Sequence, residues 1–353
     1  MRVARLPWTL ALAAVLSAGA ATGPATALVL NDFFNDSLGA PIGFTYAGNK
    51  FVGSNYFSST LYQVNLDGSG LTTFAPSVTV PNPTGEDFVG SSLGLGGFPS
   101  RDIYVASGNS IIHIDNAGTT SNTFVSGLSG NVKGIAFDST GLFGFAMLVT
   151  TDNGLVYKVT SSGVASLFAT IPGNPVIEGL DISAATFGPF AGQLLIASES
   201  ANAMFAVSPL GVVTTVPLVD GSNTPTSLPG AEELAVVPLN LGSSGNPVEG
   251  FYGSNYTVDV LKADVSQFTS ELGDAIVSDE FGAHEVFDVH YNGNAYVVTQ
   301  IGIFPNQPED GLFVTAAIIN PTGVPEPSSL AVLGSALIGA RFVRRRGLRL
   351  RKG

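Results

Sequence analysis

One turn signature recurs along this chain of 353 residues and constrains its fold more than any other feature. Each copy is an apolar residue, a polar residue, two further residues and a glycine. The copies end at Gly68, Gly118, Gly163, Gly211 and Gly323, in steps of 50, 45, 48 and 112 residues. The last step equals two steps of 56, and residues 263–267 form a degenerate copy without the glycine. Because a polar residue starts a tight turn and glycine accepts the positive φ that closes it, each copy predicts a β-hairpin.

Each expected hairpin belongs to a group of four short strands. In the third group the strands are residues 134–138, 145–149, 155–159 and 164–168; in the last group we expect the innermost strand at 285–289 and its neighbour at 295–299. Four short strands at a period of about 50 residues predict an all-β fold, a six-bladed β-propeller. The hexapeptide Phe51–Tyr56, which returns as Phe251–Tyr256, agrees with a repeat of this length. We expect residues 28–31 to supply the outer strand that the last blade lacks, which closes the ring.

The charge balance excludes several classes of protein. The chain has 14 Lys and Arg against 27 Asp and Glu, and no cysteine. An acidic chain is a poor binder of nucleic acid, and without cysteine it has no disulfides, thiolate metal site or cysteine nucleophile. Residues 28–324 keep only five cations against 26 acids, a formal net charge of −21. Divalent cations, neutral glycans or a cation-bridged matrix are therefore better partners for this part than bare polyanions.

The N-terminus has the pattern of a secretory signal peptide. Arg2 and Arg5 precede an apolar stretch at 10–21, and Ala25-Thr26-Ala27 fits the small-x-small cleavage pattern. The sequence therefore predicts a signal helix in residues 1–27, export by the Sec machinery and a mature chain that starts at Leu28.

The C-terminus combines a proline-rich hinge, an apolar segment and a basic end. Pro325, Glu326 and Pro327 precede the apolar run 330–340, for which we expect a short helix. The basic residues that follow are Arg341, Arg344, Arg345, Arg346, Arg349, Arg351 and Lys352. Such a cluster stays on the cytoplasmic side of a membrane, and the apolar run is short for a spanning helix.

This order of features resembles the PEP-CTERM sorting tail. The resemblance implies that a membrane-embedded exosortase recognises the Pro325-Glu326-Pro327 triplet, that the tail associates transiently with the inner membrane, and that the protein is secreted or placed on the cell surface. It further implies a Gram-negative bacterium that makes exopolysaccharide. We therefore divide the chain into a signal peptide (1–27), a propeller domain (28–323) and a sorting tail (324–353).

The repeat pattern resembles six-bladed propellers of the NHL-repeat and gluconolactonase-like type, at the level of the fold. Acidic residues recur where the innermost strands are expected to begin, with the candidate set Glu86, Glu178, Glu233 and Glu285. Converging carboxylates repel one another unless they are protonated, paired or metal-bound, and oxygen ligands suit Ca²⁺ or another divalent cation. The alternative is a group of solvated acids at a wet channel mouth. A second, weaker group suits a transition metal, acid–base chemistry or ordinary strand-end hydrogen bonds; it consists of His284, Glu285, Asp288 and His290.

Two functions remain open from the sequence. The first is a non-enzymatic, exported propeller that binds or organises extracellular material related to exopolysaccharide, such as a matrix glycan or a surface partner. The second is a divalent-metal-dependent hydrolase of the lactonase or esterase type, in which the four glutamates would hold the ion. The first is favoured because no catalytic residue can be assigned, and Gly-x-Ser-x-Gly, Walker A and His-Glu-x-x-His motifs are absent from the sequence.

Overall fold

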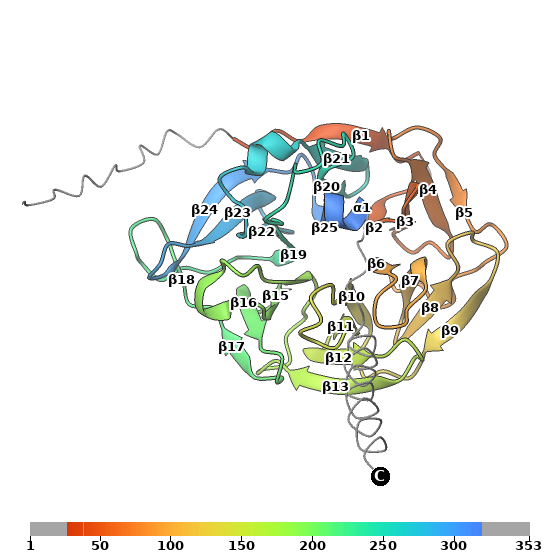
Figure 1. Ribbon diagram of the computed structural model, residues 1–353, viewed down its shortest axis with the longest axis horizontal. Helices are drawn as coiled ribbons and strands as arrows, with labels where there is room; N and C mark the ends of the chain where they lie inside the picture. Colours follow the sequence, from red (N-terminus) through yellow and green to blue (C-terminus); the bar gives the residue numbers. More distant parts are fainter. Residues whose placement is uncertain (1–26, 38, 320–353) are drawn as a thin grey trace, which may run out of the picture.

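The structure is a computed structural model that describes residues 27–37 and 39–319. Six sheets surround a central axis, which confirms the six-bladed β-propeller (Figure 1). The helical segments among these residues are η1 (Gly188–Phe190), η2 (Val265–Phe268) and α1 (Ala316–Ile319). None of the described helices has the length and apolarity needed to cross a membrane. The predicted signal helix and the sorting tail lie outside the described residues.

Blades 1 to 4 each use four consecutive strands, ordered from the axis outward. Blade 1 contains β2 (Pro41–Tyr46), β3 (Lys50–Asn55), β4 (Leu61–Asn65) and β5 (Thr72–Phe74). Blade 2 contains β6 (Val89–Leu93), β7 (Ser100–Ser107), β8 (Ser110–Ile114) and β9 (Ser121–Val125). Blade 3 contains β10 (Val132–Phe137), β11 (Met147–Thr151), β12 (Leu155–Val159) and β13 (Ala165–Thr170). Blade 4 contains β14 (Leu180–Ile182), β15 (Leu194–Ser198), β16 (Ala203–Val207) and β17 (Val213–Thr215).

The outer hairpins of these four blades form at the predicted turns. Gly68, Gly118, Gly163 and Gly211 all have φ between 71° and 82°, in the left-handed region that glycine adopts without strain. The second strands are apolar on both faces because each lies between two blades. In β11, for example, Val149 packs with Tyr104 of blade 2, whereas Leu148 packs with Ile196 of blade 4. A strand buried on both faces is selected for continuous apolar residues.

Blades 5 and 6 are interleaved in the sequence. Blade 5 contains β19 (Ala231–Val236), β22 (Ala275–Asp279), β23 (Glu285–Tyr291), β24 (Tyr296–Ile303) and, parallel to β24, β18 (Leu218–Val219). Blade 6 contains β25 (Pro308–Val314), β20 (Gly250–Asn255), β21 (Asp259–Ala263) and β1 (Asn31–Asn35). After β19 the chain therefore crosses to blade 6, returns to blade 5 for three strands, and crosses again to end on the axis.

This crossing corrects two sequence predictions. Residues 285–289 and 295–299 form the third and fourth strands of blade 5, not an innermost pair, because β22 lies between β23 and the axis. The degenerate copy at 263–267 forms no hairpin, because η2 follows β21 and directs the chain to blade 5. The copy that ends at Gly323 lies beyond the described residues.

The N-terminal segment closes the ring, as predicted. β1 pairs antiparallel with β21 as the outer strand of blade 6, although the strand spans Asn31–Asn35 and not 28–31. Before β1, Leu28 donates its N–H to the Ile301 carbonyl at 2.7 Å, which holds this part of the chain against blade 5. The first and last strands of the described chain thus occupy one blade and leave no open seam in the ring.

Candidate functional site

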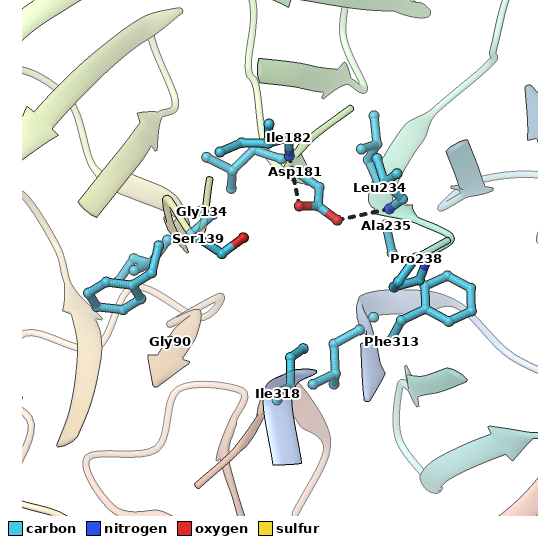
Figure 2. A pocket seen from close by; sticks show the side chains of 18 of the residues that line it. Gly90, Gly134, Ser139, Asp181, Ile182, Leu234, Ala235, Pro238, Phe313 and Ile318 are labelled. Carbon is cyan, nitrogen blue, oxygen red and sulfur yellow. Dashed lines mark hydrogen bonds between the residues drawn. The ribbon is translucent and has the colours of Figure 1, made fainter. Parts of the chain in front are cut away.

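The six innermost strands surround a central channel. β2, β6, β10, β14, β19 and β25 line a cavity of about 880 Å³ together with the loops that follow them. Most of its wall is apolar, and Figure 2 shows Ile182, Leu234, Phe313 and Ile318 around it. The polar side chains gather where the innermost strands begin, so the two ends of the channel differ in chemistry.

Charged residues gather at the end where the innermost strands begin. We call this group the acidic mouth; it contains Glu86, Lys133, Glu178, Glu199, Glu232, Glu280 and Glu309. Lys133, Glu232 and Glu309 occupy the second positions of β10, β19 and β25, while Glu178 lies just before β14. The propeller geometry places these positions at the same level around the axis. Six carboxyl groups thus share one described ammonium group.

Lys133 is the counter-ion of the acidic mouth. Its Nζ lies 2.9 Å from Glu178 Oε1 and also forms an ion pair with Glu86. Burial lowers the pKa of Lys133, but the attraction of Glu178, Glu232 and Glu199 outweighs burial and raises the pKa above its usual value. Lys133 therefore remains charged and neutralises part of the acidic mouth.

Glu178, Glu199 and Glu232 form the tightest part of this group. Each offers one carboxylate oxygen, and the three oxygens lie within 4.8 Å of one another. Glu178 and Glu232 are each only 1% exposed, and Glu232 Oε2 accepts no hydrogen bond from the described residues. Burial, and then repulsion from Glu178, raise the pKa of Glu232 well above its usual value. Either a shared proton or a bound cation can relieve this repulsion, and the three oxygens are a donor set that fits a hard divalent cation.

Glu280 and Glu309 continue the acidic mouth toward blades 5 and 6. Gln307 Nε2 donates to Glu280 Oε1 at 2.7 Å and to Glu309 Oε1 at 2.8 Å, while Glu309 Oε2 has no described partner. Burial and neighbouring carboxylates raise the pKa of Glu280 to about 8 and that of Glu309 to about 9. Near neutral pH these two groups therefore hold protons, which a bound cation would displace.

Further along the channel, two partly buried aspartates join neighbouring blades. Asp181 accepts the N–H of Val236 at 2.9 Å, and Figure 2 shows it between β14 and the strand of blade 5. Asp310 accepts the N–H of Phe44 at 2.9 Å and so connects blade 6 to blade 1. Burial raises the pKa of Asp181 to about 6 and that of Asp310 to about 7, against the lowering effect of these hydrogen bonds. Their hydrogen bonds are structural, because each satisfies an innermost-strand N–H that faces the channel.

The structure brings together only part of the predicted set. Glu86 and Glu178 meet through Lys133. Glu233 faces Gly311 of β25, where the missing side chain leaves room for its carboxylate, and it accepts a 3.3 Å hydrogen bond from Ser278. Glu285 lies on the third strand of blade 5, near Asp279, so it does not join the channel.

The second predicted group is also on the outer part of blade 5. His290 Nδ1 lies 2.9 Å from both carboxylate oxygens of Asp274 on the exposed side of β23. Asp288, on the same strand, is buried, and burial raises its pKa to about 8. These residues form a local pair and a buried acid, away from the innermost strands.

Sequence reasoning missed Glu199, Glu280 and Glu309. A signal for the last of these was present: the acid pair Glu309-Asp310 repeats Glu86-Asp87 and Glu232-Glu233. Glu199 and Glu280 lie at the ends of second strands, where no repeat pattern marks them. They reach the channel only because the second strands end at the same face at which the innermost strands begin.

At the opposite end of the channel, the described lining residues in the loops after the innermost strands carry no charge. Leu142 and Leu239 line it and are 50% and 48% exposed, and Ile318 of α1 lies beside them. We call these three residues the apolar mouth. Arg101 donates to the Ile318 carbonyl, and Glu249 Oε1 accepts the Ala316 N–H at 2.8 Å, which together hold α1 in place. The described part of the chain therefore ends at the apolar mouth.

Comparison with known proteins identifies the segment that follows. The model of the PEP-CTERM protein-sorting motif matches residues 323–346. The chain carries a PEP-CTERM motif. This motif implies exosortase-dependent export to the cell surface or the medium. No curated protein matches the chain in sequence.

Solved structures share the fold of the propeller. A putative gluconolactonase is 11% identical, with a TM-score of 0.50 over 81% of this chain and 85% of that one. Regucalcin from Agrobacterium tumefaciens, a calcium-binding protein, is 11% identical, with a TM-score of 0.50 over 79% of each chain. A chain of a nidogen–laminin complex is 12% identical, with a TM-score of 0.50 over 77% of this chain and 84% of that one. At these identities the similarity establishes the architecture alone.

Proposed function

We propose that this protein is an exported binding propeller that an exosortase processes at its tail and that binds extracellular material at the acidic mouth. The PEP-CTERM motif at 323–346 is the observation that carries the proposal. The position of α1 is compatible with it: α1, which precedes the motif in the sequence, lies at the apolar mouth, at the end of the channel opposite the acidic mouth. We further propose that the bound material is part of an exopolysaccharide matrix.

The histidines support binding over acid–base catalysis in the channel. His113 lies on β8 and pairs with Asp102 at 2.7 Å, His290 pairs with Asp274, and His284 precedes β23. All three therefore belong to outer parts of blades 2 and 5. The channel is left with carboxyl groups and one ammonium group, which suit the recognition of a polar or charged ligand.

Processing of tail variants in the native host tests the export part of this proposal. We expect the wild-type protein outside the inner membrane in a shortened form that mass spectrometry detects. Glu326→Ala should leave full-length protein in the membrane fraction, whereas the neighbouring Ser329→Ala should be processed normally. Normal shortening of the Glu326→Ala protein would falsify exosortase recognition of the triplet.

The three close oxygens of Glu178, Glu199 and Glu232 favour a second candidate, a divalent-cation-dependent hydrolase. The chemistry that a divalent cation supplies is polarisation of a substrate carbonyl. Glu178 and Glu232 would hold the ion from two neighbouring innermost strands, and Lys133 would limit the total negative charge. This set replaces Glu86, Glu178, Glu233 and Glu285, because only Glu178 of the predicted residues contributes to the close trio.

Elemental analysis of the purified exported protein and calorimetric titration with Ca²⁺ test the second candidate. A stoichiometric divalent metal, or binding heat that the Glu232→Gln variant lacks, would support it. Glu285→Gln is the matched control, since it removes a carboxylate from an outer strand. Absence of both metal and binding heat in the wild-type protein would exclude the cation-dependent mechanism.

A further inference from the structure

The repeated hexapeptide places two tyrosines side by side. Phe51–Tyr56 lies in β3 of blade 1 except for its last residue, and Phe251–Tyr256 lies in the same way in β20 of blade 6, the neighbouring blade (Figure 1). In both copies the strand ends at the asparagine, and the residue after the tyrosine has a positive φ: 51° at Phe57 and 73° at Thr257. This backbone is uncommon for residues other than glycine, and in both copies it turns the chain directly after the tyrosine.

The two copies form an exposed aromatic corner. The rings of Tyr56 and Tyr256 are 5.5 Å apart at an interplanar angle of 80°, and the Phe57 ring is 4.5 Å from that of Tyr56. Tyr56 is 42% exposed and Phe57 is 60% exposed, which is unusual for large aromatic side chains that pack against each other. We call Tyr56, Phe57 and Tyr256 the aromatic corner.

The aromatic corner adjoins the acidic mouth on two sides. On one side the Tyr56 ring packs over Gly85, where an added Cβ would lie 2.8 Å from Tyr56 Cε2, and Glu86 is the next residue. On the other side Tyr256 donates its N–H to the Gln307 carbonyl at 2.8 Å, and Gln307 Nε2 bonds to Glu280 and Glu309. Glu309 is also one cause of the raised pKa of Tyr256, after burial and Tyr56. The aromatic corner therefore lies next to Glu86 on one side and next to Gln307, which binds Glu280 and Glu309, on the other.

Two carboxyl groups beside the aromatic corner each have an oxygen without a hydrogen-bond donor among the described residues. Glu309 is 2% exposed and Glu232 is 1% exposed, yet Oε2 of each accepts no hydrogen bond from the described residues. A buried carboxylate oxygen without a donor is costly, so its retention at a channel mouth points to a donor that a ligand brings. Because the neighbours are also acidic, that donor should be positively charged.

We propose that the acidic mouth and the aromatic corner together bind a saccharide that carries a protonated amine, such as a glucosamine unit. The inference rests on the proposed function and names the ligand class of that site. The ammonium group donates hydrogen bonds to Glu309 and Glu232, and the apolar C–H face of the pyranose ring stacks on Tyr56. Aromatic faces also attract a nearby cation, so both halves of the site favour the same ligand. A bare metal ion would use the carboxylates alone and leave the aromatic corner without a role.

Calorimetric titration of the purified exported protein with three probes tests this proposal. The probes are a β-1,4-linked glucosamine tetramer, its N-acetylated counterpart, which keeps the rings and loses the charge, and Ca²⁺. We expect binding of the glucosamine tetramer at least about tenfold tighter than that of the neutral tetramer, as one charge-assisted hydrogen bond provides. Equal affinity for both tetramers, or binding of Ca²⁺ alone, would overturn the proposal.

Three variants locate the binding site. Tyr56→Ala should weaken binding of the glucosamine tetramer about tenfold, because its ring is exposed and supplies only the stacking face. Glu309→Gln should weaken it about 10- to 100-fold, because it keeps the shape but removes the carboxyl group that gives up its proton to pair with the ammonium group. Glu285→Gln makes the same chemical change on the outer part of blade 5 and should leave affinity unchanged. If Tyr56→Ala and Glu309→Gln both bind the tetramer with unchanged affinity, the binding site lies elsewhere and the proposal is wrong.

Processing of the same proteins separates this inference from the proposed function. All three variants should be shortened and exported like the wild type, because they leave the tail intact. Normal export with no affinity for the glucosamine tetramer would overturn the inference and leave the export proposal standing. A wild-type protein that binds the tetramer but is never processed would overturn the export proposal and leave the inference about the ligand standing.

Discussion

The two mouths of the channel differ in nearly every respect. The acidic mouth contains six carboxyl groups and Lys133, and oxygens of Glu178, Glu199 and Glu232 lie within 4.8 Å of one another. The apolar mouth contains Leu142, Leu239 and Ile318, and the described part of the chain ends there. Stability alone does not require a propeller to place repelling acids around its axis. The difference fits the proposal that the acidic mouth binds a ligand, because its repelling acids have no evident structural role.

The largest effect should follow from removing the counter-ion of the acidic mouth. Lys133→Met should lower the free energy of unfolding by about 3–5 kcal/mol, since it leaves the buried Glu178 carboxylate uncompensated. Lys158→Met is the control; Lys158 lies 5.2 Å from the Phe168 ring centroid on blade 3, and its loss should cost about 1 kcal/mol or less. Urea unfolding of both variants measures the difference. Equal effects would mean that Lys133 is no more important than a surface lysine.

The pH dependence of stability should show the burial of the carboxyl groups in the acidic mouth, and then their mutual repulsion. Glu280 and Glu309 have folded-state pKa values raised from 4.5 to about 8 and about 9. Because a carboxyl group with a raised pKa binds protons more tightly when folded, stability is greatest below its unfolded pKa and falls as the pH rises toward 9. Glu309→Gln should reduce the fall in unfolding free energy between low and high pH by about 2–4 kcal/mol. Unfolding measured from about pH 5 to about pH 9 tests it, and an unchanged slope in the variant would contradict the assignment.

Loss of an inter-blade hydrogen bond should have a smaller effect. Asp181→Asn keeps the size of the side chain but loses one of the two carboxylate oxygens, which accept the N–H groups of Ile182 and Val236. We expect a loss of about 1–3 kcal/mol in unfolding free energy at neutral pH. Asp220→Asn is the control, because Asp220 accepts only local N–H groups of an exposed turn. A loss no greater than that of the control would show that the bridge contributes little.

The smallest effect should come from the apolar mouth. Leu239→Ser alters a side chain that is 48% exposed, so it should change the free energy of unfolding by only about 0.5 kcal/mol. It should also leave affinity for the glucosamine tetramer unchanged, because Leu239 lies at the other end of the channel. Calorimetry and urea unfolding on one preparation check both expectations. A marked loss of affinity would show that the ligand passes through the channel, and the contrast between the two mouths would no longer separate their functions.

The sequence was sufficient for the regular part of the fold. Polar residues and glycine at turns such as Asn65–Gly68 and Asp115–Gly118 have a local physical cause, so the hairpins of blades 1 to 4 could be predicted one by one. The closing strand was predictable because the last blade lacked an outer strand and the β-prone residues 28–31 had no other place in the repeat.

The exchange between blades 5 and 6 could not be predicted in the same way. The apolar alternation of β23 matches that of an innermost strand, whereas the true innermost strand of blade 6 begins with Pro308-Glu309-Asp310-Gly311 and looks like a loop. Its position depends on pairing with β20, more than 50 residues earlier, and on the space that Gly311 leaves for Glu233. For this reason Glu285 was placed at the channel and Glu309 was missed.

The pairing of β1 with β21 makes closure of the ring depend on the last strand of the propeller. Blade 6 contains β1, yet it is incomplete until β25 has paired with β20. β25 ends at Val314, only nine residues before the sorting motif begins at 323. A chain that stops before β25 therefore lacks the motif as well as the strand that closes the ring. Every chain long enough to carry the sorting motif also carries all the strands of the propeller.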